Sequence, residues 1–393
     1  MRVLLLFPTN QNNLERWCTG ARSLGIDLAV IEYTNYPLCY PAWVGPVLQH
    51  HRNTDDPSEI APLVGDLDLS GVIPYSEPAV LLAHRLATRM GLPHNARLRP
   101  ESVRNKTLMR ELLRGAGLPQ PRTLLTTNAP ISVSDLRGVR FPVVVKPEDG
   151  VGSFGVTLSH NAEDAVAAVS AILAADPFAS GGWSIGDTVT IEELVAGPDY
   201  SCEAIVLGGE VAWSGITTHV KNGGPDFDDI GHCFPGRTAA PASAVREMAK
   251  RAVAGLGIDD GVCHIEFRES DSGPVIIEIA NRVPAGGIPQ IVEWAAGVRI
   301  EESALSIAAG IGRVARHVRG QCRYAGSRLH FASHPAIPFP DGAALVESIV
   351  HAGPHAASDA RPTQITELVG MSVVCGDDER PILEWLNQGT NRQ

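Results

Sequence analysis

The chain has 393 residues, enough for two or three domains of roughly 100–200 residues each. With 44% hydrophobic and 19% charged residues, its composition is typical of a soluble globular protein and excludes a disordered or fibrous chain. A formal net charge of −12 argues against wrapping nucleic acid, because no strongly basic face is available to displace phosphate counterions.

Residues 1–98 alternate between strand and helix patterns. RVLLLFP, DLAVIEY and GVIPY predict strands, whereas Leu14–Leu24 and PAVLLAHRLATRMGLP predict helices. MRVLLLFPTN has too few apolar residues before its proline for a signal peptide, and no apolar run is long enough to span a bilayer. Alternating strands and helices indicate a parallel sheet with helices on its faces, so we expect an N-terminal α/β domain here.

Residues 99–191 predict a small subdomain preceded by a linker helix. Asn105 can cap a helix in NKTLMRELLRGAGLPQP, which Gly117 and Pro119 end. The strands FPVVVKP and GVTLSH follow, separated by a glycine loop. An alanine-rich helix then begins at Asn161 with acidic residues in its first turn, and TVTIEELV predicts another strand.

Residues 192–393 predict a third domain built on antiparallel strands. SCEAIVLGGEVAW and GITTHV form a hairpin with two glycines at its turn. A helix from Pro241 to Leu256 leads to the strands VCHIEFR and PVIIEIA around the turn ESDSG. After about Gly310, proline and glycine breaks separate further strands, which we assign as a C-terminal extension of the same domain. The fold class is therefore α/β, with α+β character in the central part.

The cysteines bear on the compartment. There are seven, odd in number and widely dispersed, and no C-x-x-C pair occurs. They suggest neither a disulfide framework nor a zinc site, and a cytoplasmic, reducing environment fits the chain best.

The loop between FPVVVKP and GVTLSH contains Gly150, Gly152 and Gly155, which is the G-x-G-x-x-G spacing of a dinucleotide-binding turn. In that turn the third glycine lies in a helix, whereas here β-branched and apolar residues follow and predict a strand. No Gly-Lys-Ser/Thr follows either, which excludes a Walker loop. A glycine hairpin can still close its amides over phosphates, but by itself it is equally compatible with a plain surface hairpin.

Lys146 ends the strand VVVKP four residues before this loop. Its ammonium can supply a point charge to α- and β-phosphates. The alternative is a surface lysine whose stem packs on apolar neighbours. The adjacent glycine loop favours the phosphate role.

Two strands in the second half each place one acid among apolar residues: Glu266 in CHIEFR and Glu278 in VIIEIA. On adjacent antiparallel strands the two carboxylates can share a face, where they repel unless a cation lies between them. Mg²⁺ suits this position, because carboxylates, phosphates and water are its usual ligands. The alternative pairs Glu266 with Arg268 or a lysine and leaves Glu278 as an edge-strand acid.

Arg282 follows the second acid in NRVPAGG. A guanidinium there can bind a phosphoryl group or a carboxylate, and Gly286 and Gly287 would let a substrate approach the backbone. The alternative is an ordinary surface ion pair. Ser76 and Glu77 end an N-terminal strand at the carboxyl edge of a parallel sheet, where ligands gather, so Glu77 is a candidate for a substrate ammonium.

These motifs, in this order, resemble the ATP-grasp superfamily, and within it the carboxylate–amine ligases of the L-amino acid ligase (dipeptide synthetase) type. The resemblance runs from GVIPYSEPAV to about Gly310. The motifs that carry it are NKTLMRELLRGAGLPQP, VVVKPEDGVGSFGV, VTIEELVAGPDYSCEAIV, HIEFR and VIIEIANR. It implies the ATP-grasp fold, with an N-terminal parallel-sheet domain, a small lid subdomain and a C-terminal antiparallel-sheet domain. The implied activity is ATP-dependent amide bond formation between amino acids or similar substrates through an acyl phosphate, with release of ADP, as in natural-product dipeptide synthesis.

The resemblance also implies roles for individual residues. Those implied for ATP binding are Lys106, Lys146, Gly150, Gly152, Ser153, Gly155, Glu192, Glu193, Val195 and Asp199. The two lysines would hold phosphates under a lid formed by the glycine loop. Glu192, Glu193 and Val195 would form the hinge that receives adenine, mainly through backbone groups around Glu193 and Val195, and Asp199 would bond the ribose.

Glu266 and Glu278 would bind Mg²⁺, with Mn²⁺ as a substitute, and Arg282 would steady the acyl phosphate as a catalytic cation. Many ATP-grasp enzymes have Asn two residues after the second acid, whereas this chain has Ala280 there and Asn281 one place later. Because a strand alternates faces, Asn281 should point away from Glu278, which leaves a third protein ligand unassigned. Amino acid ligases often have an apolar residue there, which favours that branch over biotin carboxylase-like relatives.

KNGGPDFDDIGHCFPG, residues 221–236, resembles the substrate loop of these ligases. Asp229 and His232 are candidates to bind the substrate amino group or the acceptor amine, and His232 is our candidate general base. The alternative is a solvated acidic loop.

Three other functions stay open from the sequence. They are an ATP-grasp carboxylase or ribonucleotide–amine ligase of purine-biosynthesis type, a nucleotide-binding protein without chemistry, and a nicotinamide oxidoreductase. The expected partners are small-molecule carboxylate and amine substrates, with no nucleic acid and no membrane. A homodimer also fits, because dimers are common in the resembling group.

Overall fold

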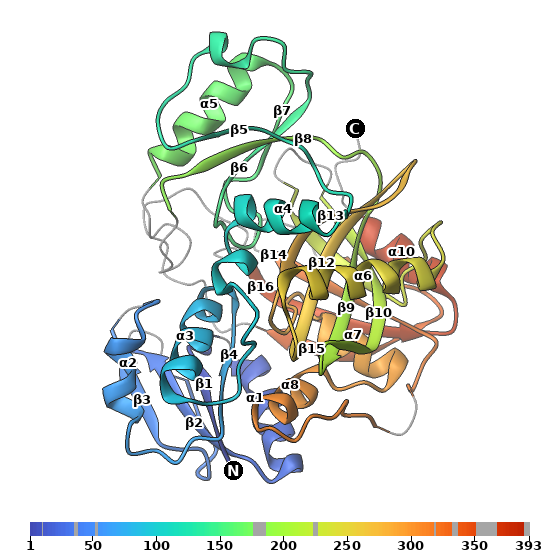
Figure 1. The fold of residues 1–393 in the computed structure, drawn as a ribbon. Helices are drawn as coiled ribbons and strands as arrows, with labels where there is room; N and C mark the ends of the chain where they lie inside the picture. The colour runs from blue at the N-terminus through green and yellow to red at the C-terminus, as the bar shows by residue number, and fades with distance from the viewer. Residues whose placement is uncertain are drawn as a thin grey trace.

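The computed structural model describes residues 1–9, 11–34, 38–51, 54–175, 186–222, 227–317, 320–331, 337–350 and 368–388. It contains a four-stranded N-terminal sheet, a second four-stranded sheet and an eight-stranded sheet (Figure 1). No helix within those ranges is long and apolar enough to cross a membrane.

The N-terminal sheet is parallel, as the alternation of strands and helices predicts, with the order β3-β2-β1-β4. Its region contains β1 (Arg2–Leu6), α1 (Gln11–Leu24), β2 (Asp27–Tyr33), β3 (Val47–His50), α2 (Pro57–Val64), β4 (Gly71–Pro74), the 3₁₀ helix η1 (Glu77–Ala79), α3 (Val80–Met90) and the 3₁₀ helix η2 (Pro100–Val103). Along β1, Val3 and Leu5 lie in one buried core and Leu4 and Leu6 in another, because side chains alternate across a strand. The sheet is thus covered on both faces.

The small sheet is antiparallel with the order β5-β8-β6-β7, and α5 packs on it. Its elements are β5 (Thr123–Thr127), the 3₁₀ helix η3 (Val133–Leu136), β6 (Val143–Pro147), β7 (Thr157–Ser159), α5 (Ala162–Leu173) and β8 (Val189–Glu193). Strands β6 and β7 pair across the glycine loop, which confirms the predicted hairpin. Asn161 caps α5 as predicted, because its side chain accepts from the Asp164 amide at 2.8 Å.

Helix α4 (Lys106–Gly115) begins at the predicted cap, where the Asn105 side chain accepts from the Leu108 amide at 2.8 Å. Its apolar residues Met109 and Leu113 belong to the core beneath the large sheet. The helix therefore packs on α6 and β13 rather than on the small sheet.

The large sheet is antiparallel throughout, with the order β13-β12-β9-β10-β11-β14-β16-β15. Its strands are β9 (Asp199–Leu207), β10 (Glu210–Lys221), β11 (Asp229–Phe234), β12 (Gly261–Ser270), β13 (Gly273–Ala280), β14 (Tyr324–Phe331), β15 (Ala343–Val350) and β16 (Leu368–Gly376). The predicted hairpin turn at Gly208 and Gly209 is confirmed, since both have positive φ and the flanking Leu207 and Glu210 pair. Strands β12 and β13 pair around the predicted ESDSG turn.

The remaining helices are α6 (Ala242–Leu256), α7 (Ile288–Ala296), α8 (Ile300–Ala308) and α10 (Glu379–Asn387). The sequence predicted α6 but missed α7, α8 and α10, the last because the region after Gly310 was assigned only strands. Helices α7 and α8 are short and separated by a left-handed cap at Gly297. The sequence suggested no disulfide framework, and it did not predict the one disulfide of the described residues, between Cys322 and Cys375. The domain boundaries after residues 98 and 191 stay a prediction.

Candidate active site

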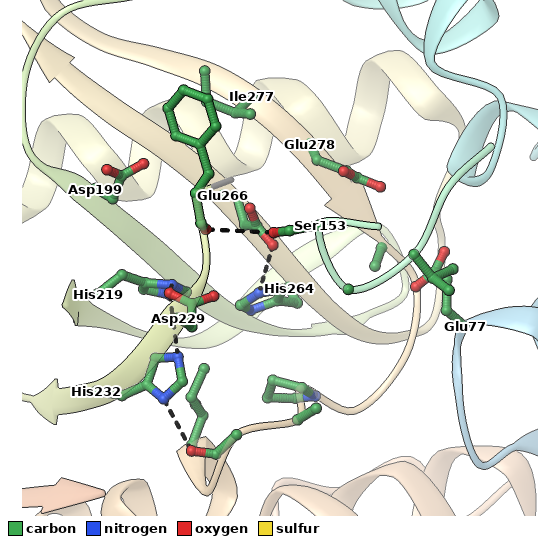
Figure 2. A pocket seen from close by; sticks show the side chains of 18 of the residues that line it. Glu77, Ser153, Asp199, His219, Asp229, His232, His264, Glu266, Ile277 and Glu278 are labelled. Carbon is green, nitrogen blue, oxygen red and sulfur yellow. Dashed lines mark hydrogen bonds and ion pairs between the residues drawn. The ribbon is translucent and has the colours of Figure 1, made fainter. Parts of the chain in front are cut away.

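One cavity of about 500 Å³ is lined by residues of the small and large sheets and by N-terminal residues that lie just outside the strands of the first sheet. Figure 2 shows part of its lining, including residues of the large sheet, the glycine loop and the segment after β4. The predicted site residues that line it are Glu77, Lys106, Lys146, Gly150, Gly152, Ser153, Glu192, Glu193, Val195, Asp199, Asp229, His232, Glu266, Glu278, Arg282, Gly286 and Gly287. Gly155 does not line the cavity; a Cβ there would lie 3.1 Å from Pro147 Cγ, so this glycine serves the packing of the loop on β6.

Lys146 and Arg110 share the buried carboxylate of Glu192. Lys146 Nζ lies 2.6 Å from Glu192 Oε2, and Arg110 donates from Nε and Nη2 to the two carboxylate oxygens at 3.0 and 3.2 Å. Burial lowers the pKa of Lys146, partly offset by Glu192. Burial raises the pKa of Glu192, but the two cations outweigh it and bring that pKa to about 2. Lys146 is buried, so the alternative of a surface lysine is wrong. The Glu192 carboxylate, which was predicted in the hinge that receives adenine, contacts the Lys146 ammonium instead.

Lys106 is the first residue of α4, where the helix dipole disfavours a cation. Its Nζ lies 3.1 Å from Glu278 Oε1 and donates to the Gly150 carbonyl at 3.1 Å. The residue is buried. Because its helix position disfavours a cation, this buried lysine is stabilised by Glu278 and the Gly150 carbonyl rather than by the helix.

The glycine loop, residues 150–155, spans part of the cavity. Gly152 and Ser153 both have φ of 58°, a left-handed conformation that is unusual for a serine. Ser153 Oγ makes a long hydrogen bond of 3.5 Å to the Phe227 carbonyl (Figure 2). The loop therefore reaches from the small sheet to the segment just before β11, as a lid would.

Glu266 of β12 and Glu278 of β13 lie directly opposite each other in the antiparallel register, and both line the cavity. The register shift beside them also brings Ile277 into the wall. Glu266 contacts His264 Nε2 at 3.3 Å, and Arg268 pairs with Asp199 instead, so the alternative pair of Glu266 with Arg268 is wrong. Glu278 does lie on an edge strand, as that alternative had it, because β13 ends the sheet. Burial raises the pKa of Glu266, but His264 outweighs this and holds it well below its usual range. Two carboxylates on one face are a donor set that fits Mg²⁺.

Asn281 does not join these acids. Ala280 lines the cavity, whereas Asn281 donates from Nδ2 to the Val262 carbonyl at 3.1 Å and accepts from Asn95 at 3.3 Å. The orientation predicted from strand alternation is confirmed. Phosphate oxygens and water would complete the coordination of a magnesium ion at the two acids.

The segment after β8 forms another part of the wall, and Arg268 holds it. Arg268 donates from Nη1 to the Val195 carbonyl and from Nε and Nη2 to the two carboxylate oxygens of Asp199, each at 2.8 Å. The Glu193 side chain accepts from the Arg122 amide at 3.0 Å. The sequence named Arg268 only as an alternative ion-pair partner, yet it fixes both the hinge and the predicted ribose acid.

Glu77 and Arg282 come from distant parts of the chain and meet at the cavity, where Arg282 Nε donates to Glu77 Oε2 at 2.5 Å. Glu77 Oε1 and the Ser76 hydroxyl are buried without a hydrogen-bond partner in the described ranges. A buried acceptor that lacks a donor costs roughly 1–3 kcal/mol, so these atoms favour a ligand that brings donors, such as an ammonium group.

Gly286 and Gly287 both have positive φ, at 65° and 79°. A Cβ on Gly286 would lie 2.4 Å from His232 Cε1, and one on Gly287 would lie 2.4 Å from Met371 Sδ. Both glycines line the cavity, but the close approach that they permit is to protein side chains rather than to a substrate.

Asp229 and His232 lie beside two residues that the sequence analysis did not single out, His219 and Lys221. His219 and His232 are cross-strand neighbours with ring centroids 4.6 Å apart, and Lys221 Nζ lies 2.9 Å from Asp229 Oδ1. Burial lowers the pKa of His232 to about 3, so its imidazole is neutral at pH 7. The solvated-loop alternative is wrong for these two residues, whereas residues 223–226 of the predicted substrate loop lie outside the described residues.

His264 and Arg110 are further residues that the sequence analysis missed. His264 Nδ1 lies 2.9 Å from the fully buried Glu203. Burial lowers the pKa of His264, but Glu203 and Glu266 raise it by more than burial lowers it, so the pKa is about 10. Both residues left a signal in spacing: His264 is two residues from Glu266 on one strand, and Arg110 is four residues after Lys106 on one helix.

Comparison with protein families gives one match, in which residues 139–290 correspond to the ATP-grasp domain. Dapdiamide A synthase of Enterobacter agglomerans is 29% identical over 234 residues, 58% of this chain and 54% of that protein. The uncharacterized protein y4rH of Sinorhizobium fredii is 28% identical over 256 residues, 64% and 51% of the two chains. Carnosine synthase 1 of Mus musculus is 28% identical over 255 residues, 60% and 30%. The chain therefore spans about half or less of the length of these relatives.

Solved structures match over the whole chain. An L-amino acid ligase from Bacillus licheniformis superposes with a TM-score of 0.75 and 17% identity, covering 100% of this chain and 98% of that one. An N5-carboxyaminoimidazole synthase from Aspergillus clavatus gives 0.72 and 16%, covering 98% and 96%. At such identities the likeness establishes the fold alone.

Proposed function

We propose that this chain, in which residues 139–290 match the ATP-grasp domain, is an ADP-forming carboxylate–amine ligase. Its substrates would be amino acids or amino-acid-like molecules, joined by an amide bond. The observation that carries this proposal is the single cavity in which the lysine pair Lys106 and Lys146, the acid pair Glu266 and Glu278, and Arg282 meet.

In the first step a substrate carboxylate attacks the γ-phosphorus of ATP and ADP leaves, giving an acyl phosphate. Lys106 and Lys146 would neutralise charge on the phosphates, and closure of the glycine loop would exclude water. Glu266 and Glu278 would hold Mg²⁺, or Mn²⁺ in its place, which offsets negative charge on the triphosphate. Adenine would bind at the hinge around Val195.

In the second step an amine attacks the acyl carbon, phosphate leaves, and the amine loses a proton. Arg282 would steady the acyl phosphate through its guanidinium. Asp229 and His232 would receive the amine, and His232 would take the proton at Nε2, since Nδ1 lies 2.9 Å from the Gly286 carbonyl. Its low pKa makes it a weak base, so Asp229, 4.0 Å away, would have to stabilise the imidazolium.

We propose that an amino acid is the acyl donor and that its ammonium group binds at Glu77. Glu77 Oε1 and the Ser76 hydroxyl support this, because an ammonium group brings the donors that they lack among the residues that the structure describes. Dapdiamide A synthase and carnosine synthase, named above, also fit amide-forming chemistry. The proposed binding partners are small molecules, and we expect neither nucleic acid nor a membrane to be a partner. The proposed location is the cytoplasm, and the proposed oligomeric state is a homodimer.

The test is a screen of amino acid pairs for ATP-dependent phosphate release, with mass spectrometry of the products. We expect ADP and phosphate to appear only with a matching pair, in equal amounts with an amide. Turnover only with aminoimidazole ribonucleotide and bicarbonate would move the chain to the purine-type alternative. ATP binding without substrate-dependent ADP release would leave a binding protein, and NAD(P)H binding by fluorescence titration would favour an oxidoreductase.

A further inference from the structure

The lining of the cavity changes character along the large sheet. Strands β9 to β13 contribute mainly charged and polar side chains, whereas the described residues of β14, β15 and β16 that line the cavity are all apolar: Leu329, Phe331, Ile349, Leu368 and Met371. We propose that this apolar wall binds the side chain of the amine substrate, which would therefore be an amino acid with an aliphatic or aromatic side chain. The inference rests on the proposed function, because it takes Asp229 and His232 as the groups that receive the amine.

The strand register connects this wall to the amine groups. His232 of β11 lies opposite Ser327 of β14, and the Ser327 hydroxyl lies 3.4 Å from His232 Nδ1. Leu329 is two residues beyond Ser327 and therefore faces the same side of the sheet. Leu329 lies opposite Met371 of β16, which in turn lies opposite Ile349 of β15. One row of apolar side chains thus begins beside the strand that carries the amine groups and ends at the edge of the sheet.

The charged residues near this row are kept out of the cavity lining. On β14, Arg328 and His330 alternate with the row and face the opposite side of the sheet, where Arg328 donates to the Trp385 carbonyl of α10 at 2.6 Å. On β15, Glu347 lies close enough to Arg16 for an electrostatic interaction. Arg328, His330 and Glu347 do not line the cavity. A charged substrate side chain at the wall would therefore be desolvated without a counter-charge from these described strands, which is unfavourable.

Met371 forms the centre of the row. Its side chain is buried, and a Cβ on Gly287 would lie 2.4 Å from its sulfur, so the start of α7 packs directly on it. An unbranched methionine side chain can adapt to neighbours of different shape. The wall should therefore select against charged side chains more strongly than it selects among apolar side chains of different size.

The test uses the full chain and compares amine substrates of matched size, with the acyl donor that the screen of amino acid pairs identifies. We expect kcat/KM for L-leucine to exceed that for L-asparagine, which has a similar shape, by roughly 100-fold. Leu329→Asn should lower the ratio of kcat/KM for L-leucine to that for glycine about 10-fold. The matched control Leu345→Asn, which lies on β15 and is exposed outside the cavity lining, should leave this ratio unchanged.

A second variant should gain a preference, which misfolding does not produce. Met371→Ala removes side-chain volume from the centre of the row, so it should raise kcat/KM for L-tryptophan relative to that for L-leucine about 10-fold. Each of these readouts is a ratio of two substrates measured on one variant, so it does not depend on the fraction of molecules that is folded. A natural preference for L-asparagine or L-lysine, or equal ratios in Leu329→Asn and Leu345→Asn, would overturn the inference.

Calorimetric titration with L-leucine in the presence of ADP and Mg²⁺ tests the wall without turnover. If no amino acid pair releases phosphate, the proposed ligase reaction fails, and this titration decides the apolar wall by itself. Binding of L-leucine that is tighter than binding of L-asparagine, and that Leu329→Asn weakens, would support the wall. Binding of L-leucine no tighter than that of L-asparagine, or unchanged in Leu329→Asn, would overturn it.

Discussion

The two ends of the cavity differ in the sign of the charges that face it. At the end under the glycine loop, Arg110 and Lys146 share one buried acid, Glu192, so cations are in excess and are held in place before any ligand arrives. At the other end, Glu266 and Asp229 are held ionised by histidine and lysine neighbours, and acids face the cavity. Under the proposed function, the first end would bind phosphate and the second would bind cations and an amine.

Removing a cation from the phosphate end should have the largest effect. Lys146→Ala should lower ADP release roughly 1000-fold, because one preorganised charge on the transferring phosphoryl group is lost. Glu192 keeps Arg110 as a partner, so circular dichroism should show an intact fold. A coupled ADP assay measures the rate, with the exposed surface lysine variant Lys250→Ala as control. Near-normal turnover would remove Lys146 from the site.

Whether the ion pairs under the glycine loop form without a ligand can be tested through the free energy of unfolding. Arg110→Met leaves Glu192 with only one of its two cations and should lower the free energy of unfolding by about 3 kcal/mol. Denaturant titration measures the change. Arg97→Met, which breaks the exposed pair with Asp259, should leave the free energy of unfolding unchanged. Equal effects of the two substitutions would mean that the buried pair of Arg110 and Glu192 does not stabilise the chain in the absence of a ligand.

The acid end depends on positioning by His264, which contacts both Glu203 and Glu266. His264→Gln should weaken divalent metal binding about 10- to 100-fold, because Glu266 loses the group that orients it. Electron paramagnetic resonance of Mn²⁺ in the presence of ADP measures this affinity without turnover. His330→Gln is the matched control, and an unchanged Mn²⁺ affinity in His264→Gln would contradict the positioning role.

The smallest expected effect concerns the turn beneath His232. Gly286→Ala and Gly310→Ala both place a side chain at positive φ, with a shared cost of roughly 1 kcal/mol. A Cβ at Gly286 also meets His232 Cε1 at 2.4 Å, whereas nothing lies within 4 Å at Gly310. We therefore expect Gly286→Ala to lower the free energy of unfolding by about 1 kcal/mol more. Equal costs in denaturant titration would mean that the contact with His232 is not tight.

Much of the fold and of the candidate site could be predicted from the sequence where the residues involved are close along the chain. β-Branched residues after the glycine loop predicted a hairpin instead of a nucleotide-binding helix, and that hairpin is present. The single acids in HIEFR and VIIEIA predicted a cross-strand pair, and Glu266 and Glu278 are paired in the register. Local patterns of alternation and turn residues carry this information.

Long-range partners were harder to predict. Arg110 reaches Glu192 across 82 residues, and His264 reaches Glu203 across 61. No local pattern specifies such a pairing, because it depends on which strands become neighbours in the sheet. Polar residues two apart on buried strands were visible, as in His219 and Lys221, but only the strand order reveals that they share one cavity.

The transfer of oxygen from a substrate carboxylate to phosphate tests the central claim most directly. With an amino acid acyl donor labelled with ¹⁸O in its carboxylate, an acyl phosphate pathway predicts one labelled oxygen in each phosphate released, together with ADP and an equal amount of amide. Unlabelled phosphate, or release of AMP and pyrophosphate, would contradict the proposed activation of the carboxylate in this cavity.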